Sequence, residues 1–304
     1  ALVELFAETI CEELDFRLEA ENMIDIATVF ASLNQRGYVV PRPHPTLVTR
    51  RILVMERFEG FSFDDVEGMQ AAGINTEEVV RVGMRGFTEG CMIHGIFHGD
   101  LHGGNLMVLP NGNIGLLDHG ITARMTPLQR NAFLRLMLLG AAGDIPGQIA
   151  AFRDLGALPA DVDIDDVMKE LGLDQAPVDP TTLTQDQLVG EIQKITKALL
   201  GYGARLPKIL MLYVKNLVFL DGAIARLAPN LDLLNEFAEL STHLAVNYGS
   251  QLAAELGVDP RELATDREAI KASFGIVDPE MDTVTYAELQ QRRELIRKRL
   301  GGGN

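Results

Sequence analysis

The sequence of 304 residues has few of the features that define several large classes of protein. It holds only two cysteines, Cys11 and Cys91, which excludes a disulfide framework or a cysteine metal cluster and favours a reduced, cytoplasmic setting. It has no uninterrupted run of about 18 apolar residues and no signal peptide, so the sequence predicts no membrane span. Peripheral contact with a membrane stays open.

Basic residues are also scarce. Acidic residues outnumber them 43 to 27, which gives a formal net charge of −16, and no block of five Lys or Arg occurs. Because such a chain repels nucleic acid unless its basic residues cluster, the composition argues against a nucleic-acid partner. Apolar residues make up 47%, enough for a sizeable core, so global disorder is excluded.

Lysine is absent before Lys169, and the chain begins with Ala1 inside an apolar pattern of helical spacing. The spacing predicts one long amphipathic helix over residues 2–33, which ends at Asn34 and Gly37. A start inside a helix, without Met, indicates a piece of a longer protein.

The next segments alternate between strand and helix signals. Dense β-branched and apolar residues at 38–40, 46–49 and 52–58, with a turn at Pro41, Pro43 and Pro45, predict two short strands within residues 38–58. Helices are expected at 64–72 and 76–95. The turn sequence PNGN predicts a hairpin that joins 106–109 to 114–117. From Pro127 onward nearly everything is expected to be helical.

One polar, glycine-rich segment carries the chemistry: HGDLHGGN at residues 98–105, followed after the hairpin by DHG at 118–120. Asn105 lies five residues after Asp100, and Asp118 lies thirteen residues after Asn105. Phosphoryl transfer needs a carboxylate that orients the attacking hydroxyl and oxygen ligands that hold Mg²⁺ on the phosphates. The same spacings occur in the protein-kinase catalytic loop and its metal-binding Asp. The pattern therefore predicts a phosphoryl-transfer site.

Two plainer interpretations apply to the histidines of this segment, His98 and His102. His and Asp in glycine-rich loops often only satisfy the turn backbone. A separate metal site is a second alternative, but imidazole prefers softer metals and no third ligand is evident. We therefore interpret both side chains as scaffolding of the loop.

The segments HGDLHGGN and LLDHG resemble the UbiB, or AarF-domain, family of atypical kinase-like proteins. EELDFRLEAEN, residues 12–22, looks like the ExD segment of that family, and Leu206–Asn230 is also similar to family sequence. The resemblance implies an α+β, protein-kinase-like fold. Its expected parts are a partial small lobe with an αC-like helix and short strands (1–60), a mostly helical large lobe (61–255) and a C-terminal helical extension (256–304).

By this similarity Asp100 is the catalytic acid, with His98 beside it in the loop. Asn105 and Asp118 would hold Mg²⁺. Glu19 would be the αC-type glutamate that pairs with a nucleotide-binding lysine. The implied cofactors are ATP and Mg²⁺.

The resemblance assigns further binding roles. Glu13 and Asp15 would form the ExD pair, which in the family contacts a covering Lys-x-Gly-Gln element. Adenine would meet the carbonyl of Glu56 and the amide of Phe58. Met55 would line the back of the adenine pocket, or simply pack in the core.

The opening helix also has an electrostatic pattern. Glu12, Asp15 and Glu19 share one stripe if the helix is continuous, and like charges at this spacing destabilise a helix by a few tenths of a kcal/mol per pair. Arg17 lies off the stripe, so we expect it to relieve Glu13 and Glu21 instead of Asp15. These three carboxylates would then be stabilised by a cation from another part of the protein, unless they form a solvated acidic face.

The sequence departs from the family pattern in several places. The nucleotide-binding lysine, the Ala-rich loop and the Lys-x-Gly-Gln element are absent, as is an Ala-Pro-Glu element, and His119 replaces the Phe of Asp-Phe-Gly. The amphipathic segment Lys208–Asp221 suits either a lipid-binding face or core packing.

The resemblance implies a Mg·ATP-dependent kinase or ATPase that supports isoprenoid-quinone biosynthesis, with the nucleotide, isoprenoid lipid or quinone-biosynthesis proteins as partners. Two alternatives stay open: a small-molecule kinase of the aminoglycoside or choline type, and a non-catalytic module that binds lipid or a partner enzyme.

Overall fold

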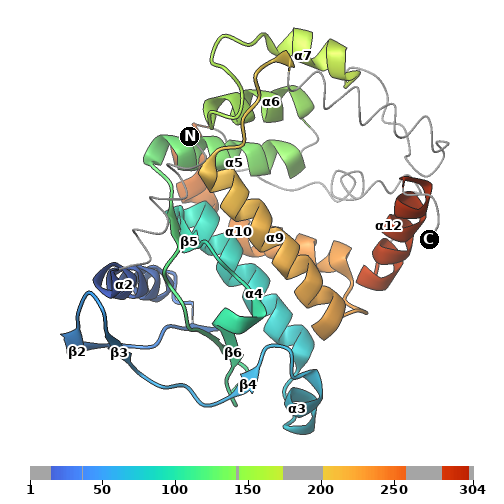
Figure 1. Cartoon of the computed structure of the whole chain (residues 1–304). Coiled ribbons are helices and arrows are strands. Elements are labelled where there is room, and N and C mark those ends of the chain that lie inside the picture. Colours follow the sequence, from blue (N-terminus) through green and yellow to red (C-terminus); the bar gives the residue numbers. More distant parts are fainter. Residues whose placement is uncertain (1–14, 36, 142–143, 174–200, 258–282, 301–304) are drawn as a thin grey trace. The chain divides into compact units, whose positions relative to one another are not determined.

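The computed structural model of the chain describes residues 15–35, 37–141, 144–173, 201–257 and 283–300 (Figure 1). The chain divides into two compact units, one made of residues 1–126 and 208–228 and the other of residues 127–207 and 229–304. The first unit combines helices with small sheets, and the described part of the second is mostly helical. The expected α+β class is confirmed, whereas the domain boundaries expected near residues 60 and 255 stay predictions.

Helix α2 (Phe16–Ser32) is the first described element of the first unit. It begins at Phe16 because Asp15, in an extended conformation, accepts the Arg17 backbone N–H and caps the helix. The chain leaves it at Asn34, which has a left-handed φ of 52°, so the expected end is confirmed. The expected start at residue 2 lies outside the described residues.

Small sheets surround the glycine-rich segment. The largest has the order β1-β7-β6-β4, formed by β1 (Tyr38–Val39), β7 (Ile114–Leu116), β6 (Leu106–Val108) and β4 (Phe61–Ser62). Here β1 pairs with β7 in parallel, and the other pairs are antiparallel. Two further antiparallel pairs join β2 (Pro43–Val48) to β3 (Leu53–Met55) and β5 (Ile96–His98) to β8 (Thr122–Arg124).

The expected hairpin is confirmed as β6 and β7, with Gly112 at a φ of 83° in the turn. The expected proline turn is wrong, because Pro43 and Pro45 lie inside β2. That strand belongs to a pair with two free edges, where a residue without an N–H is tolerated. The three-residue strands β5 and β8 were not predicted, since such short runs carry little periodicity.

The helical side of the first unit consists of three helices, α3 (Val66–Ala71), α4 (Thr76–Glu89) and α9 (Lys208–Leu227), with a π-helical turn Gly90–His94 that extends α4. Asn75 caps α4 as expected, by accepting the N–H groups of Glu77 and Glu78. Helix α9 lies along α4 (Figure 1), and the buried Thr76 hydroxyl donates to the Leu227 carbonyl at 2.7 Å. This contact ties the end of α9 to the start of α4.

The second unit confirms the expectation of a largely helical region in the residues that the structure describes. Its helices are α5 (Pro127–Ala141), α6 (Ile145–Asp154), α7 (Ile164–Leu171), α10 (Leu233–Leu256) and α12 (Tyr286–Leu300). Helix α6 packs against both α5 and α7. Across the described residues, no helix combines the length and apolarity that crossing a membrane requires.

Candidate active site

Two loops of the first unit come together because their flanking strands pair. The first loop runs from β5 to β6 and carries Asp100 and Asn105, and the second runs from β7 to β8 and carries Asp118. Because β5 pairs with β8, the start of the first loop lies beside the end of the second. Because β6 pairs with β7, the end of the first loop lies beside the start of the second. The backbone of Gly99 confirms this proximity by donating to the Ile121 carbonyl at 2.8 Å.

Asn105 joins these two loops. It is 7% exposed, its amide nitrogen donates to the Asp100 carbonyl at 3.1 Å, and its own carbonyl accepts the Leu117 N–H at 2.9 Å. The Asp118 carboxylate turns back on its loop, where Oδ1 accepts the Gly120 N–H at 2.9 Å. The structure therefore brings Asp100, Asn105 and Asp118 into one neighbourhood.

The donor set near these loops fits Mg²⁺ better than a softer metal. Asn105 and Asp118 can each offer a side-chain oxygen, and Mg²⁺ is commonly held by one or two such groups together with phosphate oxygens and water. Among the described residues, no cluster of three or more His, Cys, Asp or Glu could hold a metal by itself. A cation at this position would therefore take its remaining ligands from phosphate oxygens and water.

His98 links the backbones of both loops. Its ring is 4% exposed, its Nδ1 accepts the Asp100 N–H at 3.1 Å, and its Nε2 contacts the Asp118 carbonyl. Burial lowers the pKa of His98, which keeps the ring neutral with the proton on Nε2. These contacts support the scaffolding interpretation, and the catalytic role of His98 stays a prediction.

His119, in the position of the kinase Phe, is completely buried. Its ring lies edge-on to His98 with the centroids 5.4 Å apart, and neither ring nitrogen has a hydrogen-bond partner among the described residues. Burial, reinforced by His98, lowers the pKa of His119 to about 3. The ring therefore packs as a neutral group, as a Phe would.

Helix α2 holds the Asp118 loop through two side chains. Glu19 Oε1 accepts the His119 N–H at 3.2 Å, and the Asn22 amide donates to the His119 carbonyl at 2.7 Å. The Asn22 oxygen in turn accepts from Arg124 at 2.7 Å. Burial raises the pKa of Glu19, and the negative charge of Asp118 adds to that rise, although the His119 N–H opposes it.

The structure places the first part of the expected acidic stripe differently. Glu12 and Glu13 lie outside the described residues. Asp15 is not helical, and its carboxylate pairs with Arg17 at 2.6 Å, which holds the pKa of Asp15 at about 2. The expectation that Arg17 cannot serve Asp15 is wrong, because α2 begins only at Phe16 and the cap residue can turn toward Arg17.

The expected hinge follows β3. Met55 is 36% exposed, and Glu56 is tied to Arg42 by a backbone bond of 2.9 Å and an ion pair of 3.2 Å. The Phe58 ring lies close against Gly115 of β7, where an added Cβ would come within 2.7 Å of the ring. The segment thus contacts the hairpin that leads to Asp118, and its adenine-binding role stays a prediction.

Sequence reasoning missed two residues of α9. The Lys215 ammonium forms an ion pair with the Asp100 carboxylate, and the Asn216 side chain binds the loop backbone on either side of Asp100. The available signal was an Asn within the apolar run of α9, since a polar residue there usually has a buried partner.

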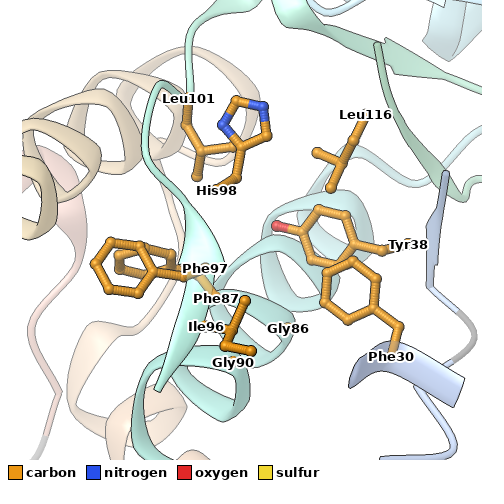
Figure 2. Close-up of a pocket in the computed structure, with 10 residues that line it drawn as sticks. All are labelled: Phe30, Tyr38, Gly86, Phe87, Gly90, Ile96, Phe97, His98, Leu101 and Leu116. Atoms are coloured by element: carbon orange, nitrogen blue, oxygen red, sulfur yellow. The ribbon is translucent and has the colours of Figure 1, made fainter. Parts of the chain in front are cut away.

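Behind His98 lies a small apolar cavity of about 20 Å³, room for about one water molecule (Figure 2). Figure 2 shows the Tyr38 and Phe30 rings stacked on one side of it, with centroids 5.0 Å apart, and His98 and Leu101 on another. The cavity is too small for a nucleotide. It belongs to the core beside the Asp100 loop.

Comparison with known proteins gives a family match. Residues 1–147 match the model of the ABC1 atypical kinase-like domain. An uncharacterized protein of Mycobacterium tuberculosis, Rv0647c, is 30% identical over 250 residues, which are 76% of this chain and 48% of that protein. A probable protein kinase UbiB from Vibrio campbellii is 25% identical, covering 76% of this chain and 43% of the relative.

A chloroplastic protein of Arabidopsis thaliana named ACTIVITY OF BC1 COMPLEX KINASE 1 is 25% identical, over 77% of this chain and 34% of its own length. This chain thus spans less than half the length of each of these three relatives. Among solved structures, the Rv3197–erythromycin complex from M. tuberculosis matches at a TM-score of 0.38 with 18% identity, covering 75% of this chain and 61% of that chain.

Proposed function

We propose that this chain, whose residues 1–147 match the model of the ABC1 atypical kinase-like domain, is the catalytic-loop portion of a Mg·ATP-dependent enzyme. This match confirms the resemblance predicted from the motifs. One observation supports the activity most directly: Asn105 bridges the Asp100 loop and the strand that leads to Asp118. Three oxygen-bearing side chains at kinase spacing are therefore held in one place.

The proposed mechanism gives each side chain one task. Asp100 orients the attacking water or hydroxyl and accepts its proton as the bond between phosphorus and the leaving nucleotide breaks. Asn105 and Asp118 would hold Mg²⁺, which would neutralise charge on the phosphates when bound. His98 holds the backbones of the two loops together, and Glu19 holds the Asp118 loop to α2.

Calorimetry on the full-length natural protein tests the metal assignment. Asp118→Asn is expected to abolish Mg²⁺-dependent nucleotide binding, because the amide keeps the shape but loses the charge. Asp161→Asn, at an exposed turn of the second unit, is the matched control and should bind like wild type. Equal affinity of wild type and Asp118→Asn would overturn the assignment of Asp118.

ATP turnover distinguishes the proposed enzyme from a non-catalytic module and from a small-molecule kinase. Asp100→Asn should leave nucleotide affinity unchanged and lower ATP turnover by about 100-fold or more, as expected for the loss of a general base. Unchanged turnover would favour a non-catalytic binding module. Fast transfer to small hydroxylated acceptors would favour the small-molecule kinase.

We further propose that the activity supports isoprenoid-quinone biosynthesis, on the strength of the family resemblance, with isoprenoid lipid or quinone-biosynthesis proteins as partners. The exposed apolar residues of α9, among them Val214 and Val218, leave room for peripheral lipid contact, while Ile209 and Leu210 of the same helix are buried. The test is the quinone content of a deletion strain complemented with wild type or with Asp118→Asn. Equal quinone content in the two would refute this role.

A further inference from the structure

Helix α9 meets the catalytic loop at two consecutive residues, Lys215 and Asn216. Asn216 is completely buried, its Oδ1 accepts the Leu101 N–H at 2.9 Å, and its Nδ2 donates to the His98 carbonyl. One carboxamide therefore spans the backbone on both sides of Asp100. This bridge fixes the position of α9 along the loop, so the residue next to it faces the loop in a defined place.

Lys215, the residue before Asn216, contacts Asp100 from this position on α9. Its ammonium pairs with Asp100 Oδ1, and the two side chains are 50% and 26% exposed. An ion pair this accessible to water contributes little to the stability of a fold. Its location on the proposed catalytic carboxylate, and not its contribution to folding, is therefore the feature that needs an explanation.

The catalytic loop has no basic residue of its own that could play this part. Residues 98–105 contain no Lys or Arg, and the His102 ring folds back to accept the Gly104 N–H at 3.1 Å. Phosphoryl transfer nevertheless depends on carboxylates and cations that are held in place before the reaction begins. In the described residues, the cation that contacts Asp100 comes from α9, 115 residues further along the chain.

We propose that Lys215 is a positioning residue for Asp100. Its ammonium fixes Oδ1 on the side of α9 and leaves Oδ2 for the attacking hydroxyl, while Asn216 keeps the helix and the loop in register. The inference rests on the proposed function for its catalytic consequence. The effect of α9 on the position of the loop does not depend on the proposed function and can be measured without nucleotide.

The experiment compares wild type, Lys215→Met and Lys215→Arg in the full-length natural protein, with Arg135→Met as the matched control. Arg135 pairs with Asp154 at 3.0 Å between α5 and α6, with exposures of 42% and 36% that resemble those of the Lys215 pair. Three quantities are measured: Mg·ATP affinity by calorimetry, kcat and KM of ATP turnover, and amide hydrogen exchange in residues 99–105.

Lys215→Met is expected to lower kcat about tenfold or more, to leave nucleotide affinity within about twofold, and to speed exchange in the loop. Lys215→Arg should restore most of kcat, and Arg135→Met should match wild type. Unchanged kcat and exchange in Lys215→Met would overturn the proposal. So would a rise in kcat, which would make the contact a restraint on Asp100, or a loss of affinity, which would make Lys215 a phosphate ligand.

Failure of the proposed function gives a different result. If wild type neither binds nor turns over Mg·ATP, the proposed function is wrong. Hydrogen exchange alone then tests the role of Lys215. Faster loop exchange in Lys215→Met would then still support the positioning of Asp100, and equal exchange would refute it.

Discussion

The carboxylate of Glu19 on α2 accepts the backbone N–H of His119 at 3.2 Å, across 100 residues of chain. The helix and the Asp118 loop therefore cannot move independently without breaking this bond. Because burial and Asp118 both raise the pKa of Glu19, its ionised form is held at a cost in this position. A cation that approaches Glu19 would relieve that cost and favour the same arrangement of the two elements.

The first prediction concerns the charge of Glu19. Glu19→Gln keeps an oxygen for the His119 N–H and removes the half-buried charge, so we expect the free energy of unfolding at pH 7 to rise by about 0.5–1 kcal/mol. Since folding raises the pKa of Glu19, protonation of this group adds stability as the pH falls from neutral toward 4.5, so the stability difference between Glu19→Gln and wild type should shrink over that range. Urea unfolding measures both, with the exposed Glu21→Gln as control. A destabilised Glu19→Gln would contradict the prediction.

The second prediction concerns His119, whose pKa falls from 6.5 to about 3 on folding. The unfolded chain then binds more protons at this group between these values, so the contribution of His119 should lower the stability of wild type relative to His119→Leu as the pH falls below 6.5, by at most about 1.4 kcal/mol per pH unit. His119→Leu should flatten this slope in urea unfolding at pH 5 and 7 without added metal. His44→Gln, at an exposed histidine, should keep the wild-type slope, and an equally steep slope in His119→Leu would refute the assignment.

The third prediction uses the tight contact between Gly86 of α4 and the Tyr38 ring. A Cβ at Gly86 would lie 2.2 Å from Tyr38 Cε2, and that ring is held by its stack on Phe30 and by donating to the Gly83 carbonyl at 2.9 Å. Gly86→Ala should therefore cost about 1–3 kcal/mol of stability. Gly222→Ala on α9 meets nothing within 4 Å and should be neutral or stabilising by about 0.5–1 kcal/mol. Thermal unfolding of both variants tests this prediction, and equal melting temperatures of Gly86→Ala and Gly222→Ala would refute it.

The fourth prediction tests the Asn216 bridge. Asn216→Leu leaves the Leu101 N–H and the His98 carbonyl without their partner, so we expect a loss of about 2–5 kcal/mol and faster exchange of the Leu101 amide. Asn247→Leu, at an exposed position of α10, should change stability by less than about 0.5 kcal/mol. Slow Leu101 exchange in a folded Asn216→Leu would show that something else holds the loop.

The local parts of this site could be predicted from the sequence. Asp100, Asn105 and Asp118 lie within nineteen residues of one another, and the turn between them has the composition of a hairpin. Spacing alone was therefore enough to place them together. The break in the expected helix at Asp15 was missed, because the contact of this side chain with Arg17 is not revealed by a periodic pattern.

The long-range parts could not be predicted. Lys215 and Asn216 are more than a hundred residues from the loop, and the apolar pattern of α9 says which side of the helix is buried but not what it meets. His119 shows the same limit, because its completely buried ring packs against His98 of the other loop, a contact that its own segment does not indicate.

The division of the first unit along the chain has a consequence for how the protein is made. Its last helix, α9, follows an insertion of 81 residues, so docking that helix must close a long loop at an entropic cost of about 4 kcal/mol. During synthesis the Asp100 loop leaves the ribosome well before Asn216 and Lys215 do. A nascent chain that has not yet exposed residues 208–228 therefore holds the HGDLHGGN loop without its contacts to Lys215 and Asn216, and gains these contacts only after α9 has emerged.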